Sequence, residues 1–72
     1  MAPQAKYWLL TVPLHCFTPY PVPGTQWIRG QLELGAGGYL HWQIYVEFER
    51  KLRLSSVKQL FSEQAHCEPS RS

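Results

Sequence analysis

The chain has 72 residues, of which 44% are hydrophobic and 14% aromatic, and its formal net charge is only +2. A chain of this length has room for one domain with one small core, which buries roughly 60% of the unfolded surface. No apolar run approaches the ~20 residues of a membrane-spanning helix, and no secretory signal is visible, so no membrane partner is predicted. The charge is too small to indicate nucleic acid by itself.

The two cysteines, Cys16 and Cys67, are too few for a disulfide scaffold and indicate a reducing compartment. Each directly follows a histidine, at His15 and His66. Neither pair has the short spacer between ligands that is typical of zinc sites. Neither a disulfide nor a zinc site is therefore expected.

The first part of the chain predicts a strand and then a loop. Residues 1–6 are expected to be a disordered lead-in. Lys6 to Val12 is aromatic and β-branched and is followed by Pro13, which is typical of a strand. Four prolines then lie between Pro13 and Gly24, so this segment is predicted to be a loop with polyproline character.

Two alternating segments, Trp27 to Leu34 and Leu40 to Glu49, predict a hairpin around a glycine-rich turn. In the second segment, apolar and polar residues alternate without exception, which is typical of a strand with one buried and one open face. Opposed residues on antiparallel strands share a face. The register that places Leu32 against Trp42 in the core also sets Glu33 opposite His41, and Gln31 opposite Gln43.

A basic segment, 50–53, is predicted to connect the hairpin to a short helix from Ser56 to about Glu63, with Ser55 as its N-cap. A further strand is predicted to begin at His66. The expected buried side of the helix consists of Leu54, Val57, Leu60 and Phe61.

Three polar side chains, Glu33, His41 and Gln43, fall side by side on the open face of this hairpin. One carboxylate oxygen, one imidazole nitrogen and one amide oxygen suit Mg²⁺ or Mn²⁺ better than zinc. The same residues also fit an ordinary solvated sheet face, and composition alone favours that simpler interpretation.

The run from Gly38 to Phe48 resembles the second motif of the replication-initiator (Rep) proteins of small circular single-stranded DNA viruses, which belong to the HUH superfamily: a histidine, a bulky apolar residue, then His or Gln. Glu33 precedes His41 by eight residues, as in geminivirus-like members. The segment from Tyr7 to Pro13 resembles the first motif, usually Phe-Thr-Leu-Asn, of which the threonine is retained. Arg29-Gly30, the basic segment, the helix and the final strand also recur in order, so the resemblance extends from Tyr7 onward.

This resemblance implies an α+β fold, an antiparallel sheet with a helix packed on one face, ferredoxin-like or RRM-like, with its C-terminal helix missing. Residues 7–72 would be the N-terminal part of a HUH endonuclease domain. The implied function is origin recognition and the nicking and joining of single-stranded DNA in rolling-circle replication, in the host nucleus. The implied ligands of Mn²⁺ or Mg²⁺ are Glu33, His41 and Gln43.

The family nucleophile is a tyrosine in a third motif, Tyr-x-x-Lys, which the 72 residues lack. None of Tyr7, Tyr20, Tyr39 and Tyr45 takes an equivalent place. The chain alone is therefore expected to bind metal and DNA without nicking, and to self-associate or to need a complementary C-terminal fragment.

The implied DNA partner is the single-stranded origin stem-loop. Exposed aromatic residues would stack on bases, and basic residues would neutralise phosphates. Two alternatives remain open: a single-stranded nucleic-acid binding module without catalysis, and an interaction domain whose polar face is only solvated. The candidate DNA-binding residues are Tyr7, Thr11, Arg29, Tyr45, Arg50, Lys51 and Arg53.

Overall fold

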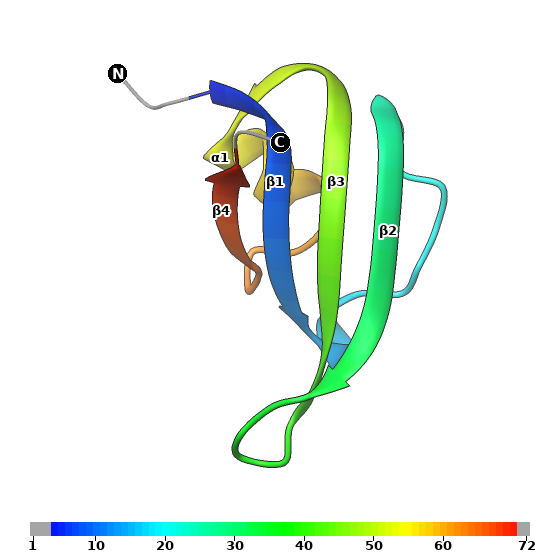
Figure 1. Ribbon diagram of the computed structural model, residues 1–72, viewed down its shortest axis with the longest axis vertical. Helices are drawn as coiled ribbons and strands as arrows, with labels where there is room; N and C mark the ends of the chain where they lie inside the picture. The colour runs from blue at the N-terminus through cyan, green and yellow to red at the C-terminus, as the bar shows by residue number, and fades with distance from the viewer. Residues whose placement is uncertain (1–3, 71–72) are drawn as a thin grey trace.

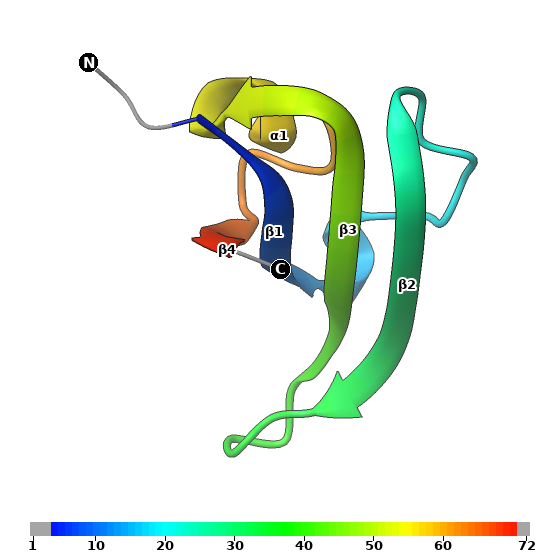
Figure 2. The ribbon, with the colours of Figure 1, turned by 45° about the horizontal axis from the view of Figure 1, so that its top comes forward.

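The computed structural model describes residues 4–70. Its four strands form one antiparallel sheet in the order β2-β3-β1-β4, with a short helix on one side (Figures 1 and 2). The predicted α+β class, with an antiparallel sheet and a helix on one face, is confirmed. In chain order the elements are β1 (Gln4–Pro13), the 3-10 turn η1 (Leu14–Cys16), β2 (Thr25–Leu34), β3 (Leu40–Arg53), α1 (Leu54–Leu60) and β4 (His66–Ser70).

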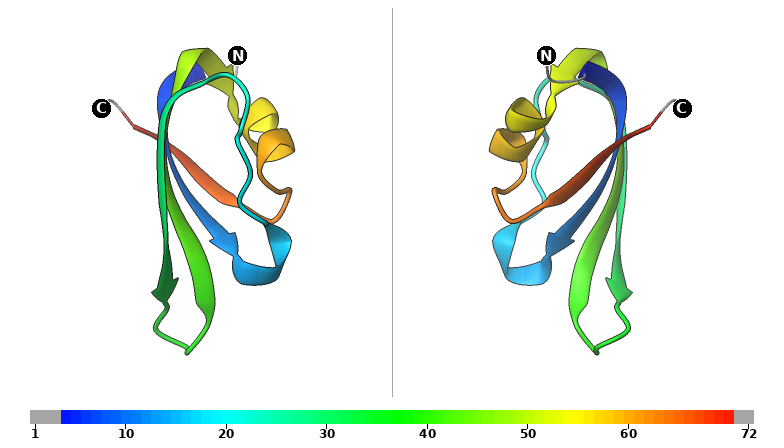
Figure 3. Two further views of the ribbon diagram at one scale, coloured as in Figure 1. Left: turned by 90° about the vertical axis from the view of Figure 1, so that its right-hand side faces the viewer. Right: turned by 90° about the vertical axis from the view of Figure 1, so that its left-hand side faces the viewer.

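The proline-rich connection between β1 and β2 covers the same side of the sheet as α1 (Figure 3). Its Val22 is only 5% exposed and belongs to the core. The ring of Phe17 lies against that of Phe61, with 5.4 Å between centroids. A ferredoxin-like β-α-β-β-α-β chain has a helix in this first crossover. Here, packed loop side chains cover the sheet instead.

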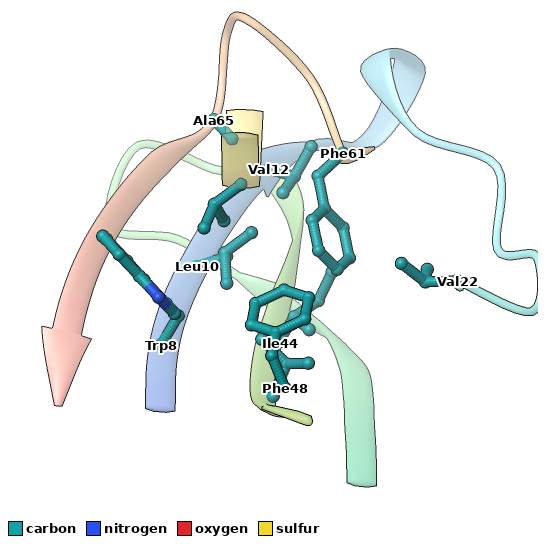
Figure 4. Close-up of a cluster of buried hydrophobic side chains, with 10 residues drawn as sticks. Trp8, Leu10, Val12, Val22, Ile44, Phe48, Phe61 and Ala65 are labelled. Atoms are coloured by element: carbon teal, nitrogen blue, oxygen red, sulfur yellow. The ribbon is translucent and has the colours of Figure 1, made fainter. Parts of the chain in front are cut away.

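The core lies between the sheet and this cover, and the two central strands supply most of it (Figure 4). Alternate residues of β1 and β3 point into it, which is the two-residue period of a strand. The indole nitrogen of the buried Trp8 donates to the carbonyl oxygen of Ala5 at 2.9 Å, so its polar atom is satisfied. The buried set consists of Trp8, Leu10, Val12, Val22, Ile44, Val46, Phe48, Val57, Phe61 and Ala65.

The register predicted for the hairpin is confirmed. Glu33 lies opposite His41, and Gln31 lies opposite Gln43. The predicted core face is correct in direction, but β2 is less buried than expected. Leu32 is 48% exposed and Leu34 69% exposed. The reason is that β2 is an edge strand, and the hairpin extends past the opposite end of the sheet from α1 (Figure 1).

Two predicted boundaries in the sheet are wrong. The strand β1 begins at Gln4, so 4–6 are not part of a disordered lead-in, whereas 1–3 lie outside the described residues. The basic segment 50–53 is the end of β3 rather than a connection. Both corrections have one cause. Gln4 pairs with Arg53, so the start of β1 and the end of β3 supply backbone hydrogen-bond partners to each other.

The helix also differs from the prediction. It spans Leu54–Leu60, and Arg53 occupies the N-cap position with no side-chain hydrogen bond, so Ser55 is not the cap. Because the chain turns from β3 straight into the helix, Leu54 stands at this junction and is exposed, whereas Val57 is buried as predicted. No helix within 4–70 combines the length and hydropathy needed to cross a membrane.

Candidate functional site

The side of the sheet opposite α1, here called the open face, carries polar and aromatic side chains in cross-strand rows. Residues that lie opposite each other on neighbouring strands share a face, so each row joins positions far apart in the sequence. The sheet order therefore places the hairpin residues beside β1 and β4. From the end nearest the hairpin turn, the rows are Glu33–His41–Pro13, Gln31–Gln43–Thr11–His66, Arg29–Tyr45–Leu9–Glu68 and Trp27–Glu47–Tyr7–Ser70.

Glu33 and His41 form the centre of the predicted metal site. The Nε2 atom of His41 lies 3.7 Å from Oε1 of Glu33, and the two side chains are 20% and 42% exposed, respectively. The other carboxylate oxygen of Glu33 accepts a hydrogen bond of 2.8 Å from Nε2 of Gln31. Adjacent ligands of an octahedral ion with bonds of ~2.1 Å are about 3 Å apart. A small side-chain adjustment would therefore let this pair hold one ion.

Gln43 lies on the same face but is turned toward β1. Its Nε2 donates to the carbonyl oxygen of Leu10 at 3.1 Å, and its Oε1 accepts a hydrogen bond of 3.3 Å from Thr11. An amide oxygen has two lone pairs, so Oε1 keeps acceptor capacity for an ion. Within 4–70, no three His, Cys, Asp or Glu side chains gather into a metal cluster. The role of Gln43 as a third protein ligand beside Glu33 and His41 therefore stays a prediction.

The described hydrogen bond of Thr11 is to Gln43, so its hydroxyl can orient a proposed metal ligand, and its role in DNA binding stays a prediction. Thr11→Val keeps the shape of the side chain and removes the hydroxyl that orients the amide. Partners that orient a ligand typically contribute about tenfold or more to metal affinity. We expect the variant to bind Mn²⁺ about tenfold more weakly in isothermal titration calorimetry. Unchanged Mn²⁺ affinity with weaker DNA binding would instead support the sequence-based role.

An aromatic hollow of about 460 Å³ lies next to these residues, and Tyr7, Trp27 and Tyr45 line it together with Arg29 and Gln43. The hollow thus brings together three of the predicted DNA-binding residues, Tyr7, Arg29 and Tyr45. Trp27, 52% exposed, adds a third ring to the hollow.

The hydroxyl of Tyr7 is tied to Glu47. The carboxylate of Glu47 accepts a hydrogen bond from Tyr7, and this bond, with the negative charge of Glu47, raises the pKa of Tyr7 above its ordinary value. Sequence reasoning missed this partner because it lies across the β1–β3 pair. This contact holds the hydroxyl of Tyr7 against β3.

The predicted basic residues separate into two groups. Lys51 and Lys6 line a hollow of about 410 Å³ that shares Tyr7 with the aromatic hollow. Arg50 instead lines a hollow with Phe48 and Leu52, which belong to the core side. The structure therefore brings Lys51 next to the aromatic hollow but not Arg50. Arg53 pairs with Gln4 at the far end of β1.

Two residues of β4 add to the open face. Nε2 of His66 lies 3.0 Å from Oε1 of Glu68. His66 is opposite Thr11, and Glu68 is opposite Leu9. The sequence predicted the strand but offered no signal for its partner. Cys67, between them, points to the other side and packs against the core, and burial raises the pKa of its thiol. Both cysteines are free.

Comparison with known proteins adds the family. The family model described as "Putative viral replication protein" matches residues 7–72. No curated protein and no solved structure gives a significant match. The matched segment begins in β1 and includes every residue of the open-face rows. The chain therefore belongs to this family of viral replication proteins.

Proposed function

We propose that this viral replication protein forms a metal-dependent domain that recognises an origin and nicks and joins single-stranded DNA, as in HUH endonucleases. The observation that carries the proposal is the contact between Glu33 and His41 on the open face, with Gln43 in the adjacent row. A carboxylate, an imidazole and an amide oxygen suit Mn²⁺ or Mg²⁺. The family supports a role in replication, and the donor set supports this chemistry.

Two of the three proposed ligands, Glu33 and Gln43, are oriented by a neighbouring side chain. Gln31 donates to Glu33, and Thr11 donates to Gln43, so two of the three ligands have a hydrogen-bonded orientation before an ion binds. When bound, Mn²⁺ or Mg²⁺ supplies positive charge that stabilises the charge developing on a scissile phosphate. The role of the protein residues is to orient the phosphate for in-line attack.

The aromatic hollow is the proposed place for the bases beside that phosphate. Gln43 lines the hollow, and Tyr45 follows it by two positions on the same face of β3, so the ring of Tyr45 lies roughly 7 Å along the strand from this proposed ligand. Aromatic rings bind unpaired bases by stacking, and basic residues track the backbone. Lys6 and Lys51 line the neighbouring hollow that shares Tyr7, and their positive charges support a role in contacting phosphates.

We propose that the nucleophile comes from outside these 72 residues. The hydroxyl of Tyr7, on strand β1, donates to Glu47. The hydroxyl of Tyr20 donates to the carbonyl oxygen of Leu60 on the helix-bearing side. Tyr45 is on a strand and Tyr39 in the hairpin turn, and neither begins a Tyr-x-x-Lys sequence. The chain by itself then binds DNA and metal without cutting.

A second candidate function is single-stranded nucleic-acid binding without catalysis. The observation that favours it is that the aromatic hollow is lined by Tyr7, Trp27 and Tyr45 and does not depend on Glu33 or His41. The two functions differ in metal binding, which only the first requires.

The DNA-binding part is tested by Tyr45→Ala with Tyr20→Ala as its matched control. The two tyrosines are 42% and 46% exposed but lie on opposite sides of the sheet. Loss of one stacked base costs about 1–3 kcal/mol, so Tyr45→Ala should weaken binding roughly 5- to 150-fold. Fluorescence anisotropy with labelled single-stranded origin DNA measures this. Equal effects of the two substitutions would contradict the assignment of the open face.

A further inference from the structure

The outer edge of β2 differs from the other edge of the sheet. Within 4–70, β2 and β4 each pair with one neighbour. The strand β4 has five residues and contains Pro69, which lacks an N–H, and short strands and prolines are common protections of a sheet edge. The strand β2 has ten residues and no proline. The connection that precedes β2 passes beside only its first half, so the remainder of this edge is open to another strand (Figure 2).

Apolar side chains accompany this edge. Ile28, Leu32 and Leu34 lie on the helix-bearing side of β2, and each is at least 40% exposed. An apolar side chain on an edge strand is typical of a strand that pairs with another chain. The adjacent surface is also apolar, since Ile28 lines a hollow with Phe17, Tyr20 and Trp42.

The charges of β2 indicate which strand fits. Two copies of β2 can pair antiparallel about a two-fold axis at Gln31. In this register, the residue numbers of any two opposed residues add up to 62. This register sets Arg29 opposite Glu33 of the second copy, and Glu33 opposite Arg29. Opposite charges in directly opposed positions stabilise a strand pair. A shift of two residues in either direction separates both ion pairs.

The same register also matches the apolar side. Ile28 then faces Leu34 of the second copy, and Leu32 faces Gly30, whose missing side chain leaves room for it. Charge, apolar contact and size thus agree in one register, which is the condition for a specific antiparallel pair.

We propose that β2 is a self-association edge, at which a second copy of this chain pairs antiparallel about Gln31 and extends the sheet to eight strands. The contact is isologous, because the same residues meet from both copies. It closes the open edge of each copy and covers Ile28, Leu32 and Leu34.

Charge reversal in this chain tests the register. In the Arg29→Glu variant, a glutamate at position 29 faces Glu33 of the second copy in both pairs. In the Glu33→Arg variant, an arginine at position 33 faces Arg29 of the second copy in both pairs. Each single variant should raise the dimer dissociation constant at least about tenfold, and the double variant should restore it. Arg50→Glu, on the other side of the sheet, is the control for net charge. Analytical ultracentrifugation measures the constant, in EDTA because Glu33 is also a proposed metal ligand.

Two outcomes would overturn the proposal. One is a wild-type chain that stays monomeric at roughly 100 µM, a concentration well above the dissociation constant expected for a specific contact. The other is a dimer that both single variants retain, which would place the contact elsewhere. Because the measurement excludes metal, failure here leaves the proposed metal-dependent function untouched, and failure of metal binding leaves this proposal untouched.

Discussion

Replacing His41 with alanine is expected to weaken Mn²⁺ binding by at least about 100-fold, because it removes the nitrogen ligand of the proposed site. Loss of a residue that only orients a ligand typically costs about 10- to 100-fold in metal affinity, and loss of the ligand itself should cost more. The Nε2 atom of His41 lies 3.7 Å from Oε1 of Glu33. Glu33 and His41 are thus the two of the three proposed metal ligands that are described as being in contact. Loss of one leaves a single carboxylate with Gln43, which is too few protein ligands for tight binding. Isothermal titration calorimetry with Mn²⁺ measures the change.

His66→Ala is the matched control. His66 is on the same open face and lines the same hollow as His41, but its contact is with Glu68. This variant should keep wild-type Mn²⁺ affinity, and circular dichroism should show that both variants are folded. If His41→Ala binds Mn²⁺ as tightly as the wild type does, the metal site is wrong, and DNA binding without catalysis becomes the better proposal.

Replacing Leu10 with alanine is expected to lower the free energy of unfolding by about 2–5 kcal/mol. Leu10 is 0% exposed at the centre of β1, so the substitution removes buried methyl groups and leaves a cavity. Whole domains have only about 5–15 kcal/mol of stability, and a small core gives values near the lower end. The variant should therefore be largely unfolded at moderate urea concentrations, where the wild type remains folded.

Leu34→Ala makes the same chemical change at a position that is 69% exposed. In a dilute sample, where self-association does not contribute, it should alter the free energy of unfolding by no more than about 0.5 kcal/mol. Urea titration followed by tryptophan fluorescence gives both values. Similar costs at the two positions would mean that β2 is buried and that the packing described for the hairpin is wrong.

The metal residues show how far local sequence reasoning extends. Glu33 and His41 belong to adjacent strands of one hairpin, and the alternation of apolar residues determines their register. Gln43 belongs to the same strand, so its face was also predictable. Its orientation was not, because Leu10 and Thr11, which hold its amide, lie more than thirty positions away on β1.

The ends of the elements show the same limit. Arg50 to Arg53 read as a basic connection, yet they extend β3 because Gln4 and Ala5 pair with their end. A backbone ladder carries little sequence signature, so a polar segment can join a sheet whenever a partner strand is beside it. The helix then starts at Leu54, directly after the strand, rather than at a serine cap.

The sequence by itself determined the hairpin register and the pairing of Glu33 with His41, because these depend on contacts between near neighbours in the chain. Its resemblance to a known family implied the α+β class. Only the tertiary structure decided that Thr11 holds Gln43, that Tyr7 is tied to Glu47, and that Arg50 lies away from the open face. It also decided that the apolar side of β2 stays largely exposed, because β2 is an edge strand and α1 packs against β3 and β4. Burial depends on which elements meet in space, and strand periodicity specifies only the direction in which a side chain points.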